Sequence, residues 1–254
     1  MIAECNSITV DRAVFGSSNQ GAIQGYQLLS WSSGIDAELS KELCQWAPTR
    51  LHRIESQEFQ LPWLAIAFPL SGNRMAVGRT CVAGQEYSGR GSANVVTTFI
   101  VLEASQWQAY QFDALGVLQC AMALGYTRST HKPAKGDLPQ IQLPAELPLS
   151  SASFFGSNNR PETQKQFPNS LQIDQWSKDI ERGKRLILVG LTDTVAIVAQ
   201  MIQRLTASAR RGFSFSTGLP LSVHRPFQVH FLDEAAYRQQ LALVGWLSDA
   251  VYLQ

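Results

Sequence analysis

Short apolar runs separated by glycine-containing turns dominate the first hundred residues. Residues 13–31 (AVFGSSNQGAIQGYQLLSW) contain two such runs around three glycines, which predicts two strands joined by a turn. Three further runs, rich in apolar and β-branched side chains, follow at residues 61–70, 74–84 and 94–102. Because turn residues separate these runs, we expect an antiparallel meander over residues 61–102.

Helical periodicity marks two segments of the same region. Residues 33–36 (SGID) have the pattern of a capping box with Ser33 as the cap, and Leu39, Leu43 and Trp46 then recur on one helical face. This pattern predicts a helix that ends near Trp46. A second helix is expected over residues 102–123.

The composition changes after residue 127. Six of the eleven prolines lie within residues 133–168, where no hydrophobic period is sustained. We therefore expect residues 128–170 to be an irregular connector with low backbone protection. It would join an N-terminal half, residues 1–127, to a C-terminal half, residues 171–254.

The C-terminal half mixes strands and helices without regular βαβ alternation. The expected helices are residues 171–182, 193–209 with Asp193 at the N-cap, and 234–253, and the expected strands are 185–190, 213–217 and 226–232. Together with the meander, this order predicts an α+β fold of antiparallel strands and packed helices, in which the two halves lie closely together.

Charge and composition describe an ordinary folded chain of 254 residues. Hydrophobic residues make up 45% of it, and the net charge of +1 is too small to attract nucleic acid over a distance. The first fifteen residues lack the basic and apolar regions of a secretory signal, and the apolar stretch at residues 186–202 is short and interrupted by Asp193. We expect a cytoplasmic protein with no membrane span and no nucleic-acid partner.

Sequence motifs for metal and nucleotide chemistry are missing. The chain has no G-x-x-x-x-G-K-[ST] loop and no G-x-S-x-G elbow, and we interpret residues 89–91 (GRG) as a hairpin turn. The cysteines Cys5, Cys44, Cys81 and Cys120 form no CxxC or Cys/His cluster. We expect no cofactor, no bound zinc and no turnover of GTP or ATP. One enzymatic alternative stays open, a hydrolase in which Cys81, a histidine such as His230 and a carboxylate meet in the fold.

Arg210 and Arg211 are the main candidate recognition residues. They end the helix predicted from residue 193, where cations also complement the helix dipole. If Phe213 and Phe215 of the next strand face the core, its hydroxyl groups would join the two guanidinium groups in binding a carboxylate or another anion. The predicted partner-binding set is Tyr26, Gln27, Ser33, Arg210, Arg211, Ser214, Ser216 and Thr217.

Three blocks of sequence carry a resemblance to a known family. They are VFGSSNQGAIQGYQLLSWSSGID at residues 14–36, GRGSANVVTTFIVL at 89–102 and ARRGFSFSTGLPLSVHRPFQVHFL at 209–232. In this order they resemble the second type of N-terminal domain of the bacterial GTPase-associated protein family, over residues 10–232. The chain departs from the family in Thr97 and Thr98, where members often have a Thr-His or Ser-His step.

The resemblance implies a non-catalytic adaptor or scaffold. Such a protein would link a GTPase, or another nucleotide-dependent module, to effectors in a bacterial conflict system used in defence. The family offers no catalytic residue that matches this sequence. Because the chain ends soon after the domain, we expect a separate subunit that recruits its protein partner, a GTPase or an effector subunit, non-covalently.

Overall fold

The computed structural model describes residues 6–18, 25–50, 63–85, 93–127, 136–146 and 167–253. Its first part is an antiparallel set of strands, as the alternating apolar runs predict. The strands are β1 (Ser7–Ser18), β2 (Gly25–Ser32), β3 (Trp63–Leu70), β4 (Arg74–Gln85) and β5 (Ala93–Leu102). β3, β4 and β5 form the predicted meander, and β5 then pairs with β1, and β1 with β2.

Part of the expected connector is regular structure. Residues 136–144 contain β6 (Gly136–Leu138), which pairs with β2, and β7 (Ile141–Pro144), which pairs with β1. The expectation of an irregular segment is wrong for these residues, because edge pairing supplies the order that their sequence pattern lacks. Residues 128–135 and 147–166 of the connector lie outside the described residues.

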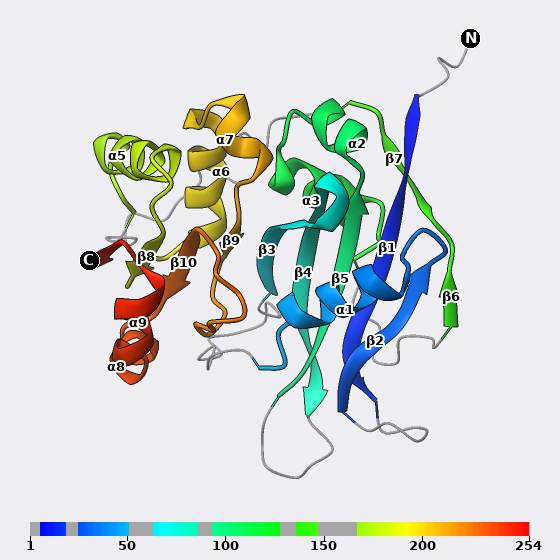
Figure 1. The fold of residues 1–254 in the computed structure, drawn as a ribbon, viewed down its shortest axis with the longest axis horizontal. Coiled ribbons are helices and arrows are strands. Elements are labelled where there is room, and N and C mark those ends of the chain that lie inside the picture. The colour runs from blue at the N-terminus through cyan, green and yellow to red at the C-terminus, as the bar shows by residue number, and fades with distance from the viewer. Residues whose placement is uncertain are drawn as a thin grey trace.

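The last part of the chain adds short strands that are parallel to one another. They are β8 (Leu186–Val189), β9 (Phe215–Ser216), β10 (Val229–Leu232) and β11 (Ala250–Leu253). In the described part of the chain, eleven strands form one sheet in the order β11-β8-β10-β9-β3-β4-β5-β1-β2-β6, with β7 beside β1. The labelled strands of this order can be followed from left to right in Figure 1.

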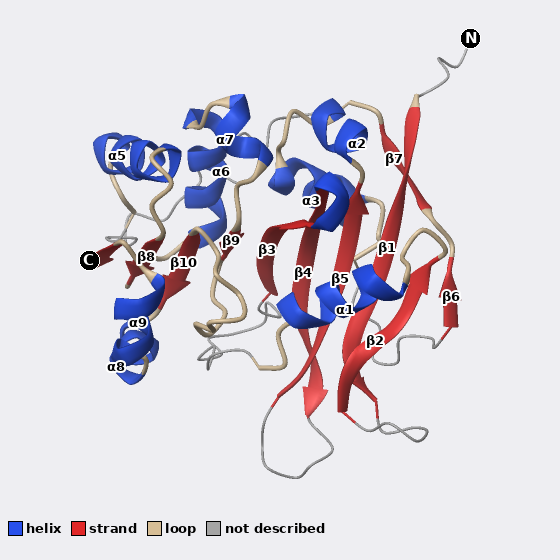
Figure 2. Ribbon diagram, viewed as in Figure 1, coloured by secondary structure: helices blue, strands red, loops and turns tan. Residues whose placement is uncertain are grey.

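Helices pack on both faces of this sheet (Figure 2), and its mostly antiparallel strands together with these helices give the predicted α+β class. One face is covered by α2 (Ala104–Ala109), α3 (Ala114–Ala123), α5 (Ser170–Glu181) and α6 (Thr194–Arg204), whose apolar side chains share one core cluster. The opposite face packs against α1 (Ala37–Trp46), and near the last strands against α8 (Glu234–Gln239) and α9 (Leu241–Leu247). No described helix is both long and apolar enough to cross a membrane.

Of the two predicted helix caps, one differs from the structure. The cap of α1 is Asp36, whose side chain accepts a hydrogen bond from the backbone N–H of Leu39 at 2.9 Å, so Ser33 is not the cap. Asp193 is the N-cap residue of α6, as predicted, although its backbone is left-handed with φ of 51° and its side chain makes no capping hydrogen bond. In both cases the apolar period located the helix.

Three predicted elements are interrupted. Residues 102–123 form two helices, because Gln111 and Phe112 adopt positive φ between α2 and α3. α6 ends at Arg204, and the short α7 (Ala207–Arg211) follows with Thr206 as its cap. The helix expected over 234–253 is divided at Gln240 into α8 and α9, and its last residues form β11.

Candidate functional site

Arg210 is held by the helix that precedes it. Its Nε donates to the carbonyl oxygen of Leu205 at 2.8 Å, and its Nη2 donates to that of Gln203 at 3.4 Å. The guanidinium group therefore satisfies carbonyl groups at the end of α6, where a cation is also favoured by the helix dipole. Arg211 is exposed, and its backbone carbonyl oxygen accepts from the indole N–H of Trp107 at 3.0 Å.

The neighbouring hydroxyl groups are turned inward. Ser214 Oγ accepts from the N–H of Gln228, and Ser216 Oγ accepts from that of Leu219, both at 3.0 Å. Thr217 Oγ1 accepts from the backbone N–H of Ala65 and donates to its carbonyl oxygen. All three residues are at most 5% exposed. The expectation that they present hydroxyl groups beside the arginines is therefore wrong, because buried backbone groups already use them. Phe213 and Phe215 do face the core.

The other predicted residues lie at a distance from Arg210. Tyr26 and Gln27 belong to β2, and four strands separate β2 from β9. With strands spaced at about 4.8 Å, the two groups are roughly 24 Å apart. The Tyr26 hydroxyl accepts from the N–H of Val95 at 3.2 Å, whereas Ser33 is exposed beyond the end of β2. The structure therefore does not combine the predicted residues into one site.

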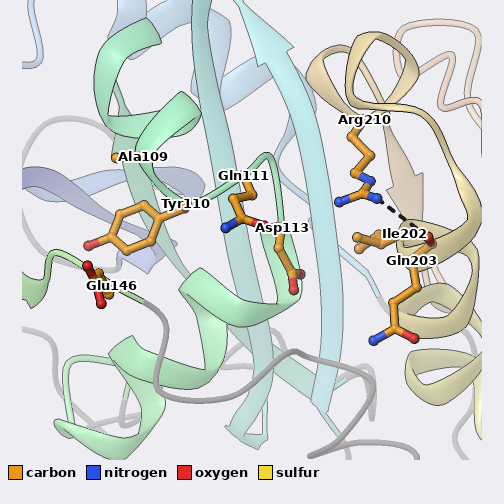
Figure 3. Close-up of a pocket in the computed structure, with 8 residues that line it drawn as sticks. All are labelled: Ala109, Tyr110, Gln111, Asp113, Glu146, Ile202, Gln203 and Arg210. Atoms are coloured by element: carbon orange, nitrogen blue, oxygen red, sulfur yellow. Dashed lines mark hydrogen bonds between the residues drawn. The ribbon is translucent and has the colours of Figure 1, made fainter.

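A cavity of about 810 Å³ opens beside Arg210, between the two halves of the chain (Figure 3). One side comes from the end of α2 and the turn into α3, and the other from α6 and α7, with Glu146 after β7. The lining residues are Ala109, Tyr110, Gln111, Asp113, Glu146, Ile202, Gln203 and Arg210. Of the residues that we predicted to bind a partner, this set contains Arg210 alone.

The wall opposite Arg210 is fixed by local hydrogen bonds. The Tyr110 hydroxyl donates to the carbonyl oxygen of Pro144 at 2.6 Å, and burial raises the pKa of Tyr110 to about 12. Asp113 caps α3 by accepting from the N–H of Gly116 at 2.9 Å. The left-handed backbone of Gln111 sets the chain direction between these two anchors. No single sequence motif marks this wall, because it depends on a turn that divides an otherwise helical pattern.

Charges of both signs line the cavity. Figure 3 shows Arg210 and Gln203 on one side, Asp113 and Gln111 on the facing turn, and Glu146 farther along beside Tyr110. A guanidinium group can bind an acidic group through charge-assisted hydrogen bonds, and the carboxylates can accept N–H donors. This arrangement suits a polar segment with groups of both kinds.

The specific cysteine and histidine pair considered above does not form. Cys81 of β4 is the cross-strand neighbour of Trp63 on β3. His230 of β10 is the neighbour of Ser216 on β9, and Ser216 is the neighbour of Ile66, which lies three residues after Trp63 on β3. Side chains alternate along a strand, so Cys81 and His230 point to opposite faces, with β9 and β3 between their strands. Burial also raises the pKa of the Cys81 thiol. The hydrolase alternative based on these two residues is therefore wrong.

Other candidate groups give no assembled centre in the described residues. Cys5, His52, His131 and the turn at 89–91 lie outside them. Among the residues that are described, no three His, Cys, Asp or Glu side chains gather where they could hold a metal ion. Several cations of the basic clusters have acidic partners, since Lys184 and Arg182 contact Asp179 and Arg204 contacts Asp174.

Comparison with known proteins places the first part of the chain in a family. The family model for GTPase-associated protein 1, N-terminal domain type 2, matches residues 9–144, which is more than half of the chain. No curated protein and no solved structure gives a significant match. The match includes the first two blocks of the resemblance and β2 to β7, with most of β1, while the third block at 209–232 lies beyond it. The chain therefore belongs to the GTPase-associated protein 1, N-terminal domain type 2, family.

Proposed function

We propose that this protein is a non-catalytic adaptor that links a GTPase, or another nucleotide-dependent module, to effectors in a bacterial conflict system. The observation that carries this proposal is the family match over residues 9–144. The adaptor works in the cytoplasm, because the GTP that its proposed partner needs is found there.

The partner-binding surface is the mouth of the cavity at Arg210, together with Arg211. Two features support this choice. Arg211 is exposed on a short helix, and its backbone is held by Trp107 of α2, so the guanidinium group projects from a fixed base. The cavity is lined from both halves of the chain, so a partner segment that enters it would contact both. Tyr26, Gln27 and Ser33 would form a separate contact at the far end of the sheet.

The proposal expects a GTPase gene beside the gene for this protein, and the test is binding to the GTPase that such a neighbouring gene encodes. Both proteins are purified, and their affinity is measured by calorimetry in the presence of GTP and of GDP. Arg211→Glu should weaken the complex by about tenfold or more, because it replaces an attractive charge with a repulsive one. Its melting temperature should stay near that of the wild type, since the Arg211 side chain is exposed.

Arg238→Glu is the matched control. Arg238 is also an exposed arginine near a helix end, with an ion pair to Glu234, and it lies on α8 away from the cavity. This variant should bind the GTPase as the wild type does. Absence of any complex with the GTPase would contradict the adaptor proposal, and equal affinities for the Arg211→Glu variant and the wild type would contradict the assigned surface.

A further inference from the structure

The turn between α2 and α3, which forms one wall of the cavity at Arg210, is a Schellman motif. The N–H of Phe112 donates to the carbonyl oxygen of Trp107 at 3.1 Å, and the N–H of Gln111 donates to that of Gln108 at 2.9 Å. The rings of Phe112 and Trp107 pack edge to face at 5.8 Å, which is the apolar contact that often accompanies this motif. The motif needs a left-handed residue after the helix, and Gln111 occupies that position with φ of 52°.

Glycine fills the same position where this motif ends two other helices. After α3 the left-handed residue is Gly125, with φ of 79°, and after α5 it is Gly183, with φ of 80°; both helix ends have the same pair of backbone hydrogen bonds. A side chain crowds the backbone in this conformation, so Gln111 is a less stable choice than glycine. The motif at Gln111 lines the cavity, and those at Gly125 and Gly183 do not. Strained residues cluster at binding sites, so the side chain of Gln111 points to a ligand.

Three side chains that line the cavity have polar groups without a partner among the residues that the structure describes. Nη1 of Arg210 is one of them, whereas Nε and Nη2 hold the guanidinium group in place. The others are the carboxylate of Glu146 and the side-chain amide of Gln111. In Figure 3, Gln111 lies between Arg210 on one side and Tyr110 with Glu146 on the other. The cavity therefore offers a cation, an amide and a carboxylate to one occupant.

The size of the cavity fits a short piece of extended chain. Its volume of about 810 Å³ is that of a cube with an edge of about 9 Å, and about three extended residues span this length. In an extended chain, the side chains of the first and third residues project to the same side, roughly 7 Å apart. Two charged residues with one residue between them can therefore enter the cavity together.

We propose that the cavity binds an extended segment of the protein partner in which an acidic and a basic residue flank one central residue. The acidic side chain accepts from Nη1 of Arg210, and the basic side chain donates to Glu146. The side-chain amide of Gln111, which both donates and accepts, binds the backbone of the central residue. Asp113 lines the facing turn, where its carboxylate caps α3. This proposal rests on the proposed adaptor function, because it names the part of the partner that the cavity takes.

The test measures the binding of capped tripeptides by calorimetry at millimolar concentrations. The parent probes are Ac-Glu-Gly-Lys-NH₂ and Ac-Lys-Gly-Glu-NH₂, since either chain direction brings one charge to Arg210 and the other to Glu146. In the matched probes, Gln replaces either the Glu or the Lys. We expect the tighter parent probe to bind about tenfold more tightly than each of its matched probes, because each of these lacks one charge-assisted contact.

Variants of the protein assign each contact. Arg210→Gln should remove the preference for Glu over Gln in the probe, and Glu146→Gln should remove the preference for Lys over Gln. Gln111→Gly should weaken the binding of every probe about fivefold or more, because the backbone of the central residue loses its hydrogen bonds. The same variant should melt at a higher temperature than the wild type, since glycine adopts the left-handed backbone without strain. A purely structural role of Gln111 would change the melting temperature alone.

Asn73→Gly is the matched control. Asn73 also has a left-handed backbone, with φ of 59°, but its turn is held by hydrogen bonds from Ser71 to Glu42 of α1, on the opposite face of the sheet. This variant should bind the probes as the wild type does. Failure of both parent probes to bind the wild type would overturn the proposal, as would wild-type affinity in the Gln111→Gly variant.

Two outcomes separate this proposal from the adaptor proposal. Binding of a parent tripeptide by a protein that forms no complex with the GTPase would contradict the adaptor proposal alone. A GTPase complex that excess tripeptide does not displace, and that Gln111→Gly does not weaken, would contradict the proposal for the cavity alone.

Discussion

At the scale of single residues, Asp179 ties the end of the chain to α5. Its side chain is 1% exposed, receives Lys184 Nζ at 2.9 Å and accepts a hydrogen bond from the Tyr252 hydroxyl at 2.8 Å. The hydrogen bond from Lys184 is the main cause that lowers the pKa of Asp179 to about 2, and those from Tyr252 and Gln175 add to it. Both the helix and β11 therefore depend on one ionised carboxylate.

We predict that this carboxylate makes stability depend on acidity. Because its pKa in the fold lies below that of the unfolded chain, its contribution of about 2 kcal/mol is present above pH 4 and is lost as the pH falls toward 2. Asp179→Asn should destabilise the protein by about 3 kcal/mol at neutral pH, since it breaks a buried pair. Urea unfolding from pH 7 down to pH 3 measures both effects. A difference between variant and wild type that does not shrink in acid would contradict this assignment.

His230 should make the stability of the fold depend on pH in a different range. It is buried, and burial is the main cause that lowers its pKa to about 4. Below pH 6.5 the unfolded chain therefore binds a proton that the folded protein does not, and the fold loses up to about 3 kcal/mol by pH 4. Substitution by Gln should remove this dependence between pH 6.5 and 5. The comparison is again made by urea unfolding, and parallel curves for wild type and variant would show that His230 is not the group responsible.

At the scale of elements, the start of α1 offers two candidate caps that lie three positions apart, Ser33 and Asp36. Asp36→Ala should cost about 1 kcal/mol, because its carboxylate satisfies the N–H of Leu39 and complements the helix dipole. Ser33→Ala is the control and should change the melting temperature very little, since Ser33 is exposed and is not the cap. A larger loss for Ser33→Ala than for Asp36→Ala would restore the capping box predicted from the sequence.

At the scale of the whole molecule, the two halves are joined through β3 and β9. Only two residue pairs connect these strands, Ile66 with Ser216 and Ala67 with Phe215. Thr217 strengthens the joint, because its hydroxyl bonds both the N–H and the carbonyl oxygen of Ala65. The backbone N–H of Thr217 also donates to the carbonyl oxygen of Ala65 at 3.1 Å, so the hydroxyl group is needed mainly as the acceptor for the N–H of Ala65.

We predict that Thr217→Val destabilises the whole chain by about 1–3 kcal/mol, because it leaves the buried backbone N–H of Ala65 without an acceptor, while the Ala65 carbonyl oxygen keeps the backbone N–H of Thr217. Since one sheet spans both halves, calorimetry should show a single transition at a lower temperature. Thr192→Val, at an exposed threonine before α6, is the control and should melt as the wild type does. Two separate transitions in the wild type would show that the halves unfold independently.

The sequence determined the features that depend on neighbouring residues. Alternating apolar runs and turn residues located β1 to β5 and their antiparallel order, and the helical period located α1, α5 and α6. These signals are local, because side chains alternate along a strand and recur every three to four residues along a helix. The blocks at 14–36 and 89–102 also carried the family resemblance, through residues that the family match contains.

Only the tertiary structure decided the rest. Residues 250–253 continue a helical pattern in the sequence but form β11, because pairing with β8 and the bond from Tyr252 to Asp179 hold them extended. Ser214, Ser216 and Thr217 have the composition of an exposed recognition strand, yet they are buried by contacts with residues far along the chain. Likewise, the strand register sets Cys81 and His230 on opposite faces. Such contacts join residues that are distant in sequence, so no local pattern encodes them.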